Sequence, residues 1–121
     1  MHTREEKLQA FGRLLDVMDN LRAKCPWDRK QTNESLRPNT IEETFELCDA
    51  LMKNDNQEIC KELGDVLLHI VFYAKIGSEK GEFDIAVCAT NCATSLSTAT
   101  RTCMDPMPNA LRKAKSRWTR C

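Results

Sequence analysis

The sequence predicts an all-α protein built as an antiparallel helical bundle, and three observations lead to this prediction. Apolar residues recur at steps of three and four in three separate stretches, which is the period of a helix with one buried face. Only a short polar cluster separates the last two stretches, and so short a connection folds consecutive helices back against each other. The 121 residues, 41% of them hydrophobic, are enough for one domain with a single modest core.

The first helix is expected over residues 5–21, where the apolar positions are Leu8, Phe11, Leu14, Leu15, Val17, Met18 and Leu21. The stretch 24–40 that follows is polar and has a proline near each end, Pro26 and Pro38. Because prolines and polar clusters interrupt regular structure, we expect an ordered loop there, with one short helical turn.

The second helix is expected to begin at Thr40, because Thr40 and Glu43 have the spacing of a capping box. It should run to about Lys53, with an apolar stripe formed by Ile41, Phe45, Cys48, Leu51 and Met52. Residues 54–56 predict a turn. The third helix should then extend from Gln57 to about Gly77, with a wide apolar face made of Ile59, Leu63, Val66, Leu67, Ile70, Val71 and Ala74.

The chain changes character after residue 84. Residues 89–102 hold five threonines and two serines, with Leu96 as the one large apolar side chain, and they show no helix or strand period. We therefore expect a helical domain over residues 1–87 and an atypical, irregular segment over 88–121 that is not an independent domain. Within that segment, residues 109–120 could form a short basic helix.

Seven cysteines are many for this length, and their odd number argues against a disulfide framework. Cys48 and Cys60 are expected to act as small buried hydrophobes. Cys88, Cys92 and Cys103 allow a zinc site as an alternative, which their spacing does not favour.

The charges and the hydropathy pattern exclude several classes of protein. All 18 acidic residues lie within residues 1–105, whereas five of the 18 basic residues follow Asp105. An acidic body argues against binding nucleic acid and suits a protein that concentrates divalent cations. The longest apolar stretch, 66–74, is far shorter than the roughly 20 residues that cross a bilayer, and charges occupy the place of a signal-peptide core. We expect no membrane partner and a cytoplasmic location.

Two pairs of carboxylates carry the chemistry. Glu43 and Glu46 are three residues apart on the second predicted helix, and Glu62 and Asp65 are three apart on the third, so each pair lies on one helical face. In an antiparallel hairpin the two pairs can converge, and four acids would repel each other unless a cation held them. Hard oxygen ligands favour Mg²⁺, with Mn²⁺ second, and Mg²⁺ commonly takes phosphate oxygens as well. The alternative is an ordinary solvated acidic face.

Four further residues have both a functional and a structural interpretation. Glu42 could orient a water or simply face solvent, and Trp27 could stack on a base or cap the core. His69 could support Asp65, although a hydrogen-bonded histidine at the edge of the core is favoured. Gly64 costs about 1 kcal/mol of helix propensity, which suggests that another group approaches the backbone there.

The order and spacing of several motifs over about residues 4–85 resemble the MazG-type nucleoside triphosphate pyrophosphohydrolases. The matching motifs are Cys25-Pro26-Trp27-Asp28, Gln31-Thr32, Ser35-Leu36-Arg37-Pro38, Glu42-Glu43-x-x-Glu46, Glu62-Leu63-Gly64-Asp65-Val66-Leu67-Leu68, Val71-Phe72-Tyr73-Ala74 and Gly81-Glu82-Phe83-Asp84. Together they are specific, whereas any one of them would be weak.

The resemblance implies an all-α homodimer that cleaves nucleoside triphosphates to monophosphate and pyrophosphate with Mg²⁺, clearing unwanted nucleotides from the pool. It implies that Glu43, Glu46, Glu62 and Asp65 are both the metal ligands and the catalytic residues. Glu42 and Trp27 are the expected nucleotide contacts. Members of this family continue with a helix that has a Lys-Leu element and an Arg-His-Pro-His-Val-Phe-like motif, and this sequence has neither.

A shifted reading frame would account for the missing segment. With suitable synonymous codons, residues 88–106 read in another frame give Cys-Asp-Lys-Leu-Cys-Asp-Lys-Leu-Ile-Tyr-Arg-His-Pro-His-Val-Tyr-Gly-Ser, which is like the family's segment. The alternative is a divergent tail. The altered segment also keeps open a second function, a catalytically impaired nucleotide-binding or interaction module. Resequencing the gene tests the frame.

Overall fold

The computed structural model describes residues 1–104, with the backbone alone for residues 99–104. This part of the chain forms α1 (Arg4–Lys24), α2 (Pro26–Lys30), α3 (Asn33–Lys53), α4 (Asn56–Glu79) and α5 (Ile85–Met104), and residues 1–104 contain no strand. The predicted all-α class is therefore confirmed. The chain divides into two units, Met1–Asp84 and Ile85–Cys121, and each is described by itself. The basic helix expected over residues 109–120 lies outside the described residues, and the boundary expected near residue 87 stays a prediction.

Helix α1 begins at a capping box. The amide of Glu6 donates to Thr3 Oγ1 over 3.2 Å, and the amide of Thr3 donates to Glu6 Oε2 over 2.6 Å, so two donors at the helix start are satisfied. The helix ends at Cys25, whose backbone is extended because it precedes Pro26, and Pro26 opens α2. Helix α2 is the short helical turn that the sequence predicts in this stretch.

Helix α3 begins earlier than the sequence suggests. Its capping box pairs Thr32 with Ser35: the Ser35 amide donates to Thr32 Oγ1 over 3.1 Å, and the Thr32 amide donates to Ser35 Oγ over 2.9 Å. The start predicted at Thr40 was therefore wrong. Pro38 lies inside the helix, where it removes one backbone donor. The capping box of Thr32 and Ser35 and the burial of Leu36 stabilise the helix by more than Pro38 destabilises it. Thr40 is therefore an interior residue of α3.

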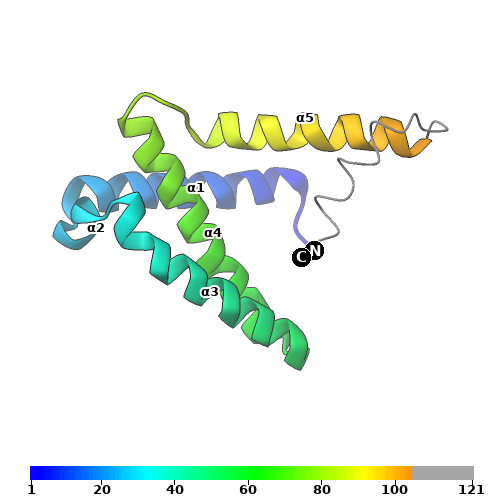
Figure 1. Ribbon diagram of the computed structural model, residues 1–121, viewed down its shortest axis with the longest axis horizontal. Helices are drawn as coiled ribbons and strands as arrows, with labels where there is room; N and C mark the ends of the chain where they lie inside the picture. Colours follow the sequence, from blue (N-terminus) through cyan, green and yellow to red (C-terminus); the bar gives the residue numbers. More distant parts are fainter. Residues whose placement is uncertain (105–121) are drawn as a thin grey trace. The chain divides into compact units, whose positions relative to one another are not determined.

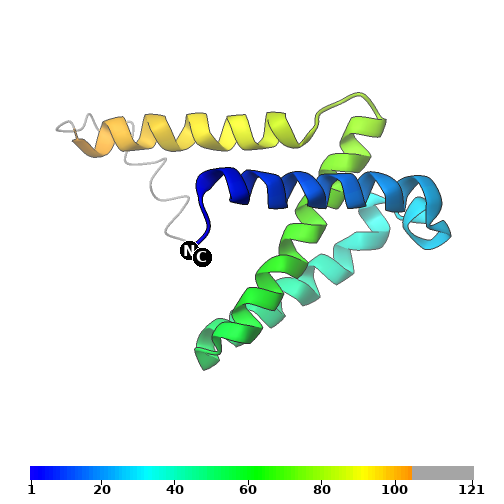
Figure 2. The ribbon, with the colours of Figure 1, turned by 180° about the vertical axis from the view of Figure 1, so that it is seen from behind.

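The turn predicted at residues 54–56 is confirmed. Asn54 ends α3 in the left-handed conformation with φ 57°, which asparagine tolerates better than most residues. Asp55 then caps α4, because its carboxylate accepts from the amides of Gln57 and Glu58 over 3.0 and 3.3 Å. The result is an antiparallel hairpin of α3 and α4, which lie side by side along their lengths (Figures 1 and 2).

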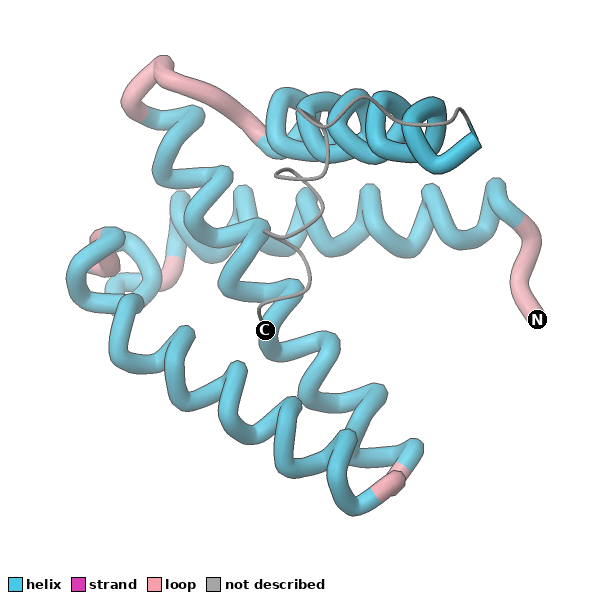
Figure 3. Tube along the Cα trace, turned by 45° about the vertical axis from the view of Figure 1, so that its right-hand side comes forward, coloured by secondary structure: helices cyan, strands magenta, loops and turns pink. Residues whose placement is uncertain are grey.

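The core of the first unit lies where α1 crosses the hairpin, toward the start of α3 and the end of α4 (Figure 3). Its fully buried members are Met18, Leu36, Val71, Phe72 and Ile76. Half-buried side chains surround them, namely Phe11, Leu14, Leu15, Leu67 and Tyr73.

The other end of the hairpin keeps an uncovered apolar face. Ile41 is 58% exposed, Phe45 is 71% exposed and Met52 is 86% exposed. Cys48 and Cys60 are exposed as well, so the expectation that they are buried was wrong. The helical period of the apolar residues on α3 was predicted correctly, but α1 covers only one end of the hairpin. The predicted apolar stripe on α3 is therefore exposed to solvent in the single chain.

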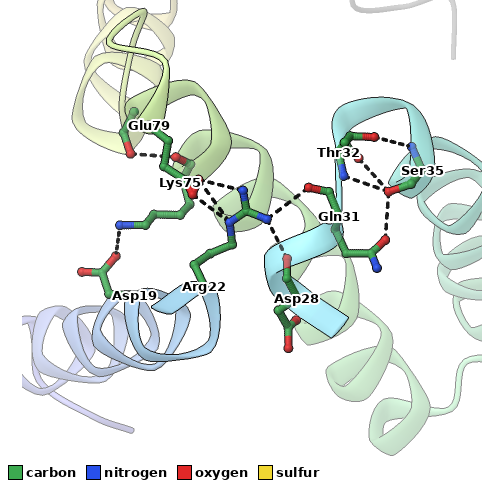
Figure 4. Close-up of polar contacts among 9 residues, drawn as sticks. Asp19, Arg22, Asp28, Gln31, Thr32, Ser35, Lys75 and Glu79 are labelled. Atoms are coloured by element: carbon green, nitrogen blue, oxygen red, sulfur yellow. Dashed lines mark hydrogen bonds and ion pairs between the residues drawn. The ribbon is translucent and has the colours of Figure 1, made fainter. Parts of the chain in front are cut away.

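Arg22 joins α1, α2 and α4 through one guanidinium group (Figure 4). Its Nε donates to Glu79 Oε1 over 2.8 Å and its Nη2 donates to Glu79 Oε2 over 2.7 Å. Its Nη1 donates to the carbonyls of Asp28 and Gln31 over 2.6 and 3.1 Å, which satisfies acceptors at the end of α2. The group also lies over the ring of Phe72. Arg22 thus fixes the path of the chain between α1 and α3.

The Arg22–Glu79 pair makes the stability depend on pH. Hydrogen bonding to Arg22 lowers the pKa of Glu79 from its ordinary value of 4.5. A carboxylate with a lowered pKa stabilises the fold above its ordinary pKa and loses that contribution as the pH falls through the folded-state pKa. In urea denaturation, lowering the pH below about 4.5 should reduce the free energy of unfolding less in Glu79→Gln than in the unmodified chain. Equal losses in both proteins would contradict this prediction.

Gly77 lies against an aromatic ring that the next loop brings back onto α4. A Cβ at Gly77 would be 2.6 Å from two carbons of the Phe83 ring. Gly81, at φ 71°, reverses the chain between them, and the Glu82 amide donates to the Gly77 carbonyl over 3.1 Å. Only glycine leaves room for the ring in this position.

The substitution Gly77→Ala should destabilise the protein by about 1–2 kcal/mol, because the added methyl displaces the ring. In a Phe83→Ala background the same substitution should stabilise by up to about 1 kcal/mol, because alanine is the better helix former. Urea denaturation of the four proteins gives both differences. An effect of the same sign in both backgrounds would show that the ring does not determine the outcome.

Helix α5 corrects the expectation of irregular structure over residues 89–102. The apolar residues of this segment are mostly small, and its threonines fit a helix when their hydroxyls bond the preceding turn, as Thr98 Oγ1 does by donating to the Thr94 carbonyl over 3.1 Å. Cys88 and Cys92 are exposed, and the side chain of Cys103 lies outside the described part, so the zinc alternative stays untested. None of the helices in residues 1–104 has the length and apolar character of a membrane span.

Candidate functional site

Three carboxylates from two helices converge on the hairpin. Glu43 comes from α3, and Glu62 and Asp65 come from successive turns of α4. One oxygen from each of them lies within 4.8 Å of the other two. The hairpin turn at Asn54 places the residues at comparable distances from the fold-back, which is why residues 19 positions apart meet.

Glu62 is the buried member of this group. Its side chain is in a helix interior position with 7% exposure, although a lone glutamate is rarely buried. Oε1 accepts a hydrogen bond from Lys61 Nζ over 2.7 Å, whereas Oε2 is buried without a hydrogen-bond partner. A buried, unpaired carboxylate oxygen is costly. A cation bound between the three carboxylates would remove that cost, and the all-oxygen donor set fits Mg²⁺ or Mn²⁺.

Glu46 is not part of the converged group, but it is electrostatically connected to it. It is exposed one turn after Glu43 on α3. Desolvation raises the pKa of Glu46, and repulsion from Glu43, Glu62 and Glu42 raises it further. Of the four carboxylates predicted to act together, the structure thus places an oxygen of each of three within 4.8 Å of the others and leaves the fourth, Glu46, exposed at the rim of this group.

Lys61 is a charged neighbour that the sequence analysis missed. Its Nζ lies 2.7 Å from Glu62 Oε1 and 3.0 Å from Asp65 Oδ2. Hydrogen bonds to these two carboxylates raise the pKa of Lys61, so the ammonium stays charged. Its side chain is 65% exposed and can therefore move aside when another cation binds. The i, i+4 spacing of Lys61 and Asp65 was the available signal.

A second polar group lies one turn away from the carboxylates. Thr40 Oγ1 is 2.7 Å from His69 Nδ1, and it also bonds the hydroxyl of Tyr73. His69 shows the hydrogen-bonded position at the edge of the core that the sequence analysis favoured, with no bond to Asp65. The sequence did not predict the bonds of Thr40 and Tyr73. Thr40 was interpreted as the N-cap of a helix, and an N-cap side chain bonds the backbone of its own helix.

The remaining predicted site residues lie apart from the convergence. Glu42 is exposed on α3, and Trp27 on α2 is 58% exposed, with its carbonyl accepting a hydrogen bond from Gln31 Nε2. Both are open to a ligand, and neither touches the carboxylate group. The expectation of a close approach at Gly64 was wrong within the single chain, since no atom lies within 4 Å of a Cβ placed there.

Comparison with known proteins gives one family. Residues 31–98 match the family model described as the MazG nucleotide pyrophosphohydrolase domain. The chain is 48% identical over 77 residues to the nucleoside triphosphate pyrophosphohydrolase/pyrophosphatase MazG of Thermotoga maritima, an alignment that covers 62% of this chain and 30% of that protein. It is 44% identical over 86 residues to the nucleoside triphosphate pyrophosphohydrolase of Escherichia coli K12, covering 68% and 33%.

The chain therefore spans about a third of the length of these relatives. A solved structure, that of a mazG-related protein from Thermotoga maritima, superposes with a TM-score of 0.67 over 89% of this chain and 95% of that one, at 24% identity. This likeness supports the helical fold. The family match covers more than half of the sequence and includes all four predicted carboxylates. By this match the chain belongs to the MazG nucleotide pyrophosphohydrolase domain family.

Proposed function

We propose that this chain is a Mg²⁺-dependent nucleoside triphosphate pyrophosphohydrolase, which converts a nucleoside triphosphate and water into the monophosphate and pyrophosphate. The observation that carries the proposal is the convergence of Glu43, Glu62 and Asp65, of which Glu62 is buried and has one oxygen without a hydrogen-bond partner. Such a group suits a divalent cation, and a cation held by few carboxylates has room for phosphate oxygens. The names of the relatives support the same reaction.

Each side chain has a role in this reaction. Glu43, Glu62 and Asp65 would hold the metal, which when bound neutralises phosphate charge and activates water. Glu46 would join the ligands from the rim, where a bound cation offsets the repulsion that, after desolvation, raises the pKa of Glu46. Water adds to phosphorus, and the bond between the α- and β-phosphates breaks with pyrophosphate as the leaving group. Glu42 and Trp27 would contact the nucleotide.

The test is Mg²⁺-dependent pyrophosphate release from a panel of nucleoside triphosphates. The unmodified chain should release pyrophosphate, and Glu43→Ala should not. Asp49→Ala is the matched control, because Asp49 lies on the same helix and pairs only with Lys53, four residues on. Binding of nucleotide without release, in the unmodified chain, would instead identify an impaired nucleotide-binding module.

We further propose that a second copy covers the apolar face of α3. A shallow groove of about 290 Å³, lined by Thr40, Ile41, Thr44, Phe45 and Cys48, runs along this face. Ile41, Phe45 and Met52 on this face are largely exposed, and an exposed apolar patch marks an interaction site when it is contiguous. A symmetric dimer would pair the same face on both chains.

The substitution Phe45→Glu should convert the dimer to a monomer, because a buried charge without a partner opposes association. Light scattering after size-exclusion chromatography measures the mass. Leu8→Glu is the control, since Leu8 is similarly exposed on α1, away from this face. A dimer that survives Phe45→Glu would place the interface elsewhere.

The biological role follows from the reaction. Hydrolysis to monophosphate removes a nucleotide from the pool that polymerases use, so we propose that the protein clears unwanted nucleotides. Such a pool is cytoplasmic, which is the location that we expect for this chain. The substrate in this role is the nucleotide alone, with no nucleic acid or membrane as partner.

A further inference from the structure

A single threonine carries all the side-chain hydrogen bonds that join α3 to α4. Thr40 Oγ1 bonds His69 Nδ1 over 2.7 Å and also bonds the hydroxyl of Tyr73. It bonds the Leu36 carbonyl, within its own helix, over 3.1 Å. The other contacts between α3 and α4 are packing contacts, because the ion pairs of these helices lie within α3, within α4, or between α4 and α1.

Counting protons gives the one state in which all three bonds of this network form together. A threonine hydroxyl has one proton and a carbonyl can only accept, so in that state the Thr40 proton goes to the Leu36 carbonyl. The Thr40 oxygen must then accept from both other partners. His69 is therefore the tautomer that carries its proton on Nδ1, and Tyr73 donates its hydroxyl proton. In this tautomer His69 Nε2 keeps a lone pair that can accept a hydrogen bond.

The network lies one helical turn from the carboxylates on both helices. Thr40 precedes Glu43 by three residues on α3, and His69 follows Asp65 by four residues on α4. Residues at these spacings share a helical face. A bond between Thr40 and His69 thus limits how far α3 can slide or rotate against α4. That sliding is the motion that would separate Glu43 from Glu62 and Asp65.

We propose that Thr40, with His69 and Tyr73, is a positioning group for the carboxylate site. It sets the register of α3 against α4 and holds His69 in one tautomer, with Nε2 free to accept from a water or hydroxyl at the site. The inference rests on the proposed metal site. Thr40 does not touch the metal or the nucleotide in this proposal, and it acts through the placement of Glu43.

The test compares Thr40→Val, which keeps the shape without the hydroxyl, with Thr40→Ser, which keeps the hydroxyl. Mn²⁺ binding without nucleotide, measured on chains shown by circular dichroism to be folded, should weaken about tenfold or more in Thr40→Val. Thr40→Ser should restore it. Tyr73→Phe removes one bond of the network and should have a smaller effect. Equal Mn²⁺ affinity in Thr40→Val and the unmodified chain would overturn the positioning role.

The tautomer gives a second readout that does not need metal. The chain has two histidines, so ¹⁵N spectra at about pH 8, where histidine is ordinarily neutral, resolve His69 from His2. We expect the proton on Nδ1 in the unmodified chain and in Thr40→Ser, and a mixture of tautomers in Thr40→Val. A proton on Nε2 in the unmodified chain would overturn the network. An unmodified chain with this tautomer but no Mn²⁺ binding would refute the metal site, and with it the positioning role, while leaving the network in place.

Discussion

The substitution Glu62→Gln should abolish the response to Mg²⁺ while leaving the metal-free protein as stable as before or more stable. The amide keeps the shape of the side chain and its bond to Lys61, but it removes a buried charge whose Oε2 has no partner. Relief of repulsion from Glu43 and Asp65 should offset any loss of packing. Pyrophosphate release should fall by about 10²–10³-fold, since a metal supplies several kcal/mol of charge stabilisation.

Thermal unfolding with and without Mg²⁺ separates these effects. A ligand at about 100 times its dissociation constant stabilises a fold by roughly 2.7 kcal/mol, so the unmodified chain should show a clear rise in Tm. Glu62→Gln should show none. Asp49→Asn, a carboxylate-to-amide change at an exposed position of α3, should keep the rise. A full Mg²⁺ response in Glu62→Gln would rule out Glu62 as a ligand.

The substitution Arg22→Met should destabilise the protein by about 2–4 kcal/mol, because it removes a partly exposed ion pair and two bonds to backbone carbonyls at once. The estimate is moderate because the Glu79 side chain is 36% exposed, so water can solvate it when Arg22 is lost. The loss of the bond to the Gln31 carbonyl should matter more, since this carbonyl ends a helix of only five residues, whereas the Asp28 carbonyl also accepts from the Gln31 amide. Urea denaturation measures the loss.

Two further variants identify which bonds matter. Glu79→Gln keeps the bonds from Arg22 to the carbonyls and should cost less than Arg22→Met. Arg22→Lys keeps the charge but cannot reach Glu79 and two carbonyls together, so it should recover little stability. If lysine restored full stability, the charge alone would be what matters, and the geometry of the guanidinium would not.

Local sequence signals were reliable where neighbouring residues determine the structure. The helical periods of α1 and α4 and the turn at Asn54 and Asp55 depend on side chains within a few residues of each other, and the structure has them where they were predicted. The start of α3 was missed because Ser35 replaces the usual glutamate of a capping box, and Pro38 was read as the end of a loop. Helix α5 was missed because most of its apolar residues are small, and because a threonine such as Thr98 can bond the preceding turn of a helix.

The residues of the candidate site likewise include some that the sequence predicts and some that it does not. Glu43, Glu62 and Asp65 could be placed together from spacing and a short turn, because both are local properties of one hairpin. The network of Thr40, His69 and Tyr73 could not, since it depends on which turn of α3 faces which turn of α4.

By itself the sequence determined the helical class, the hairpin of α3 and α4, the family and the carboxylates that face one another. These follow from periodicity, capping and motif order along the chain. Only the tertiary structure decided that Glu62 is buried with an unpaired oxygen and that the apolar face around Phe45 is open. The physical reason is that burial depends on where another helix lies, and α1 covers one end of the hairpin and not the other.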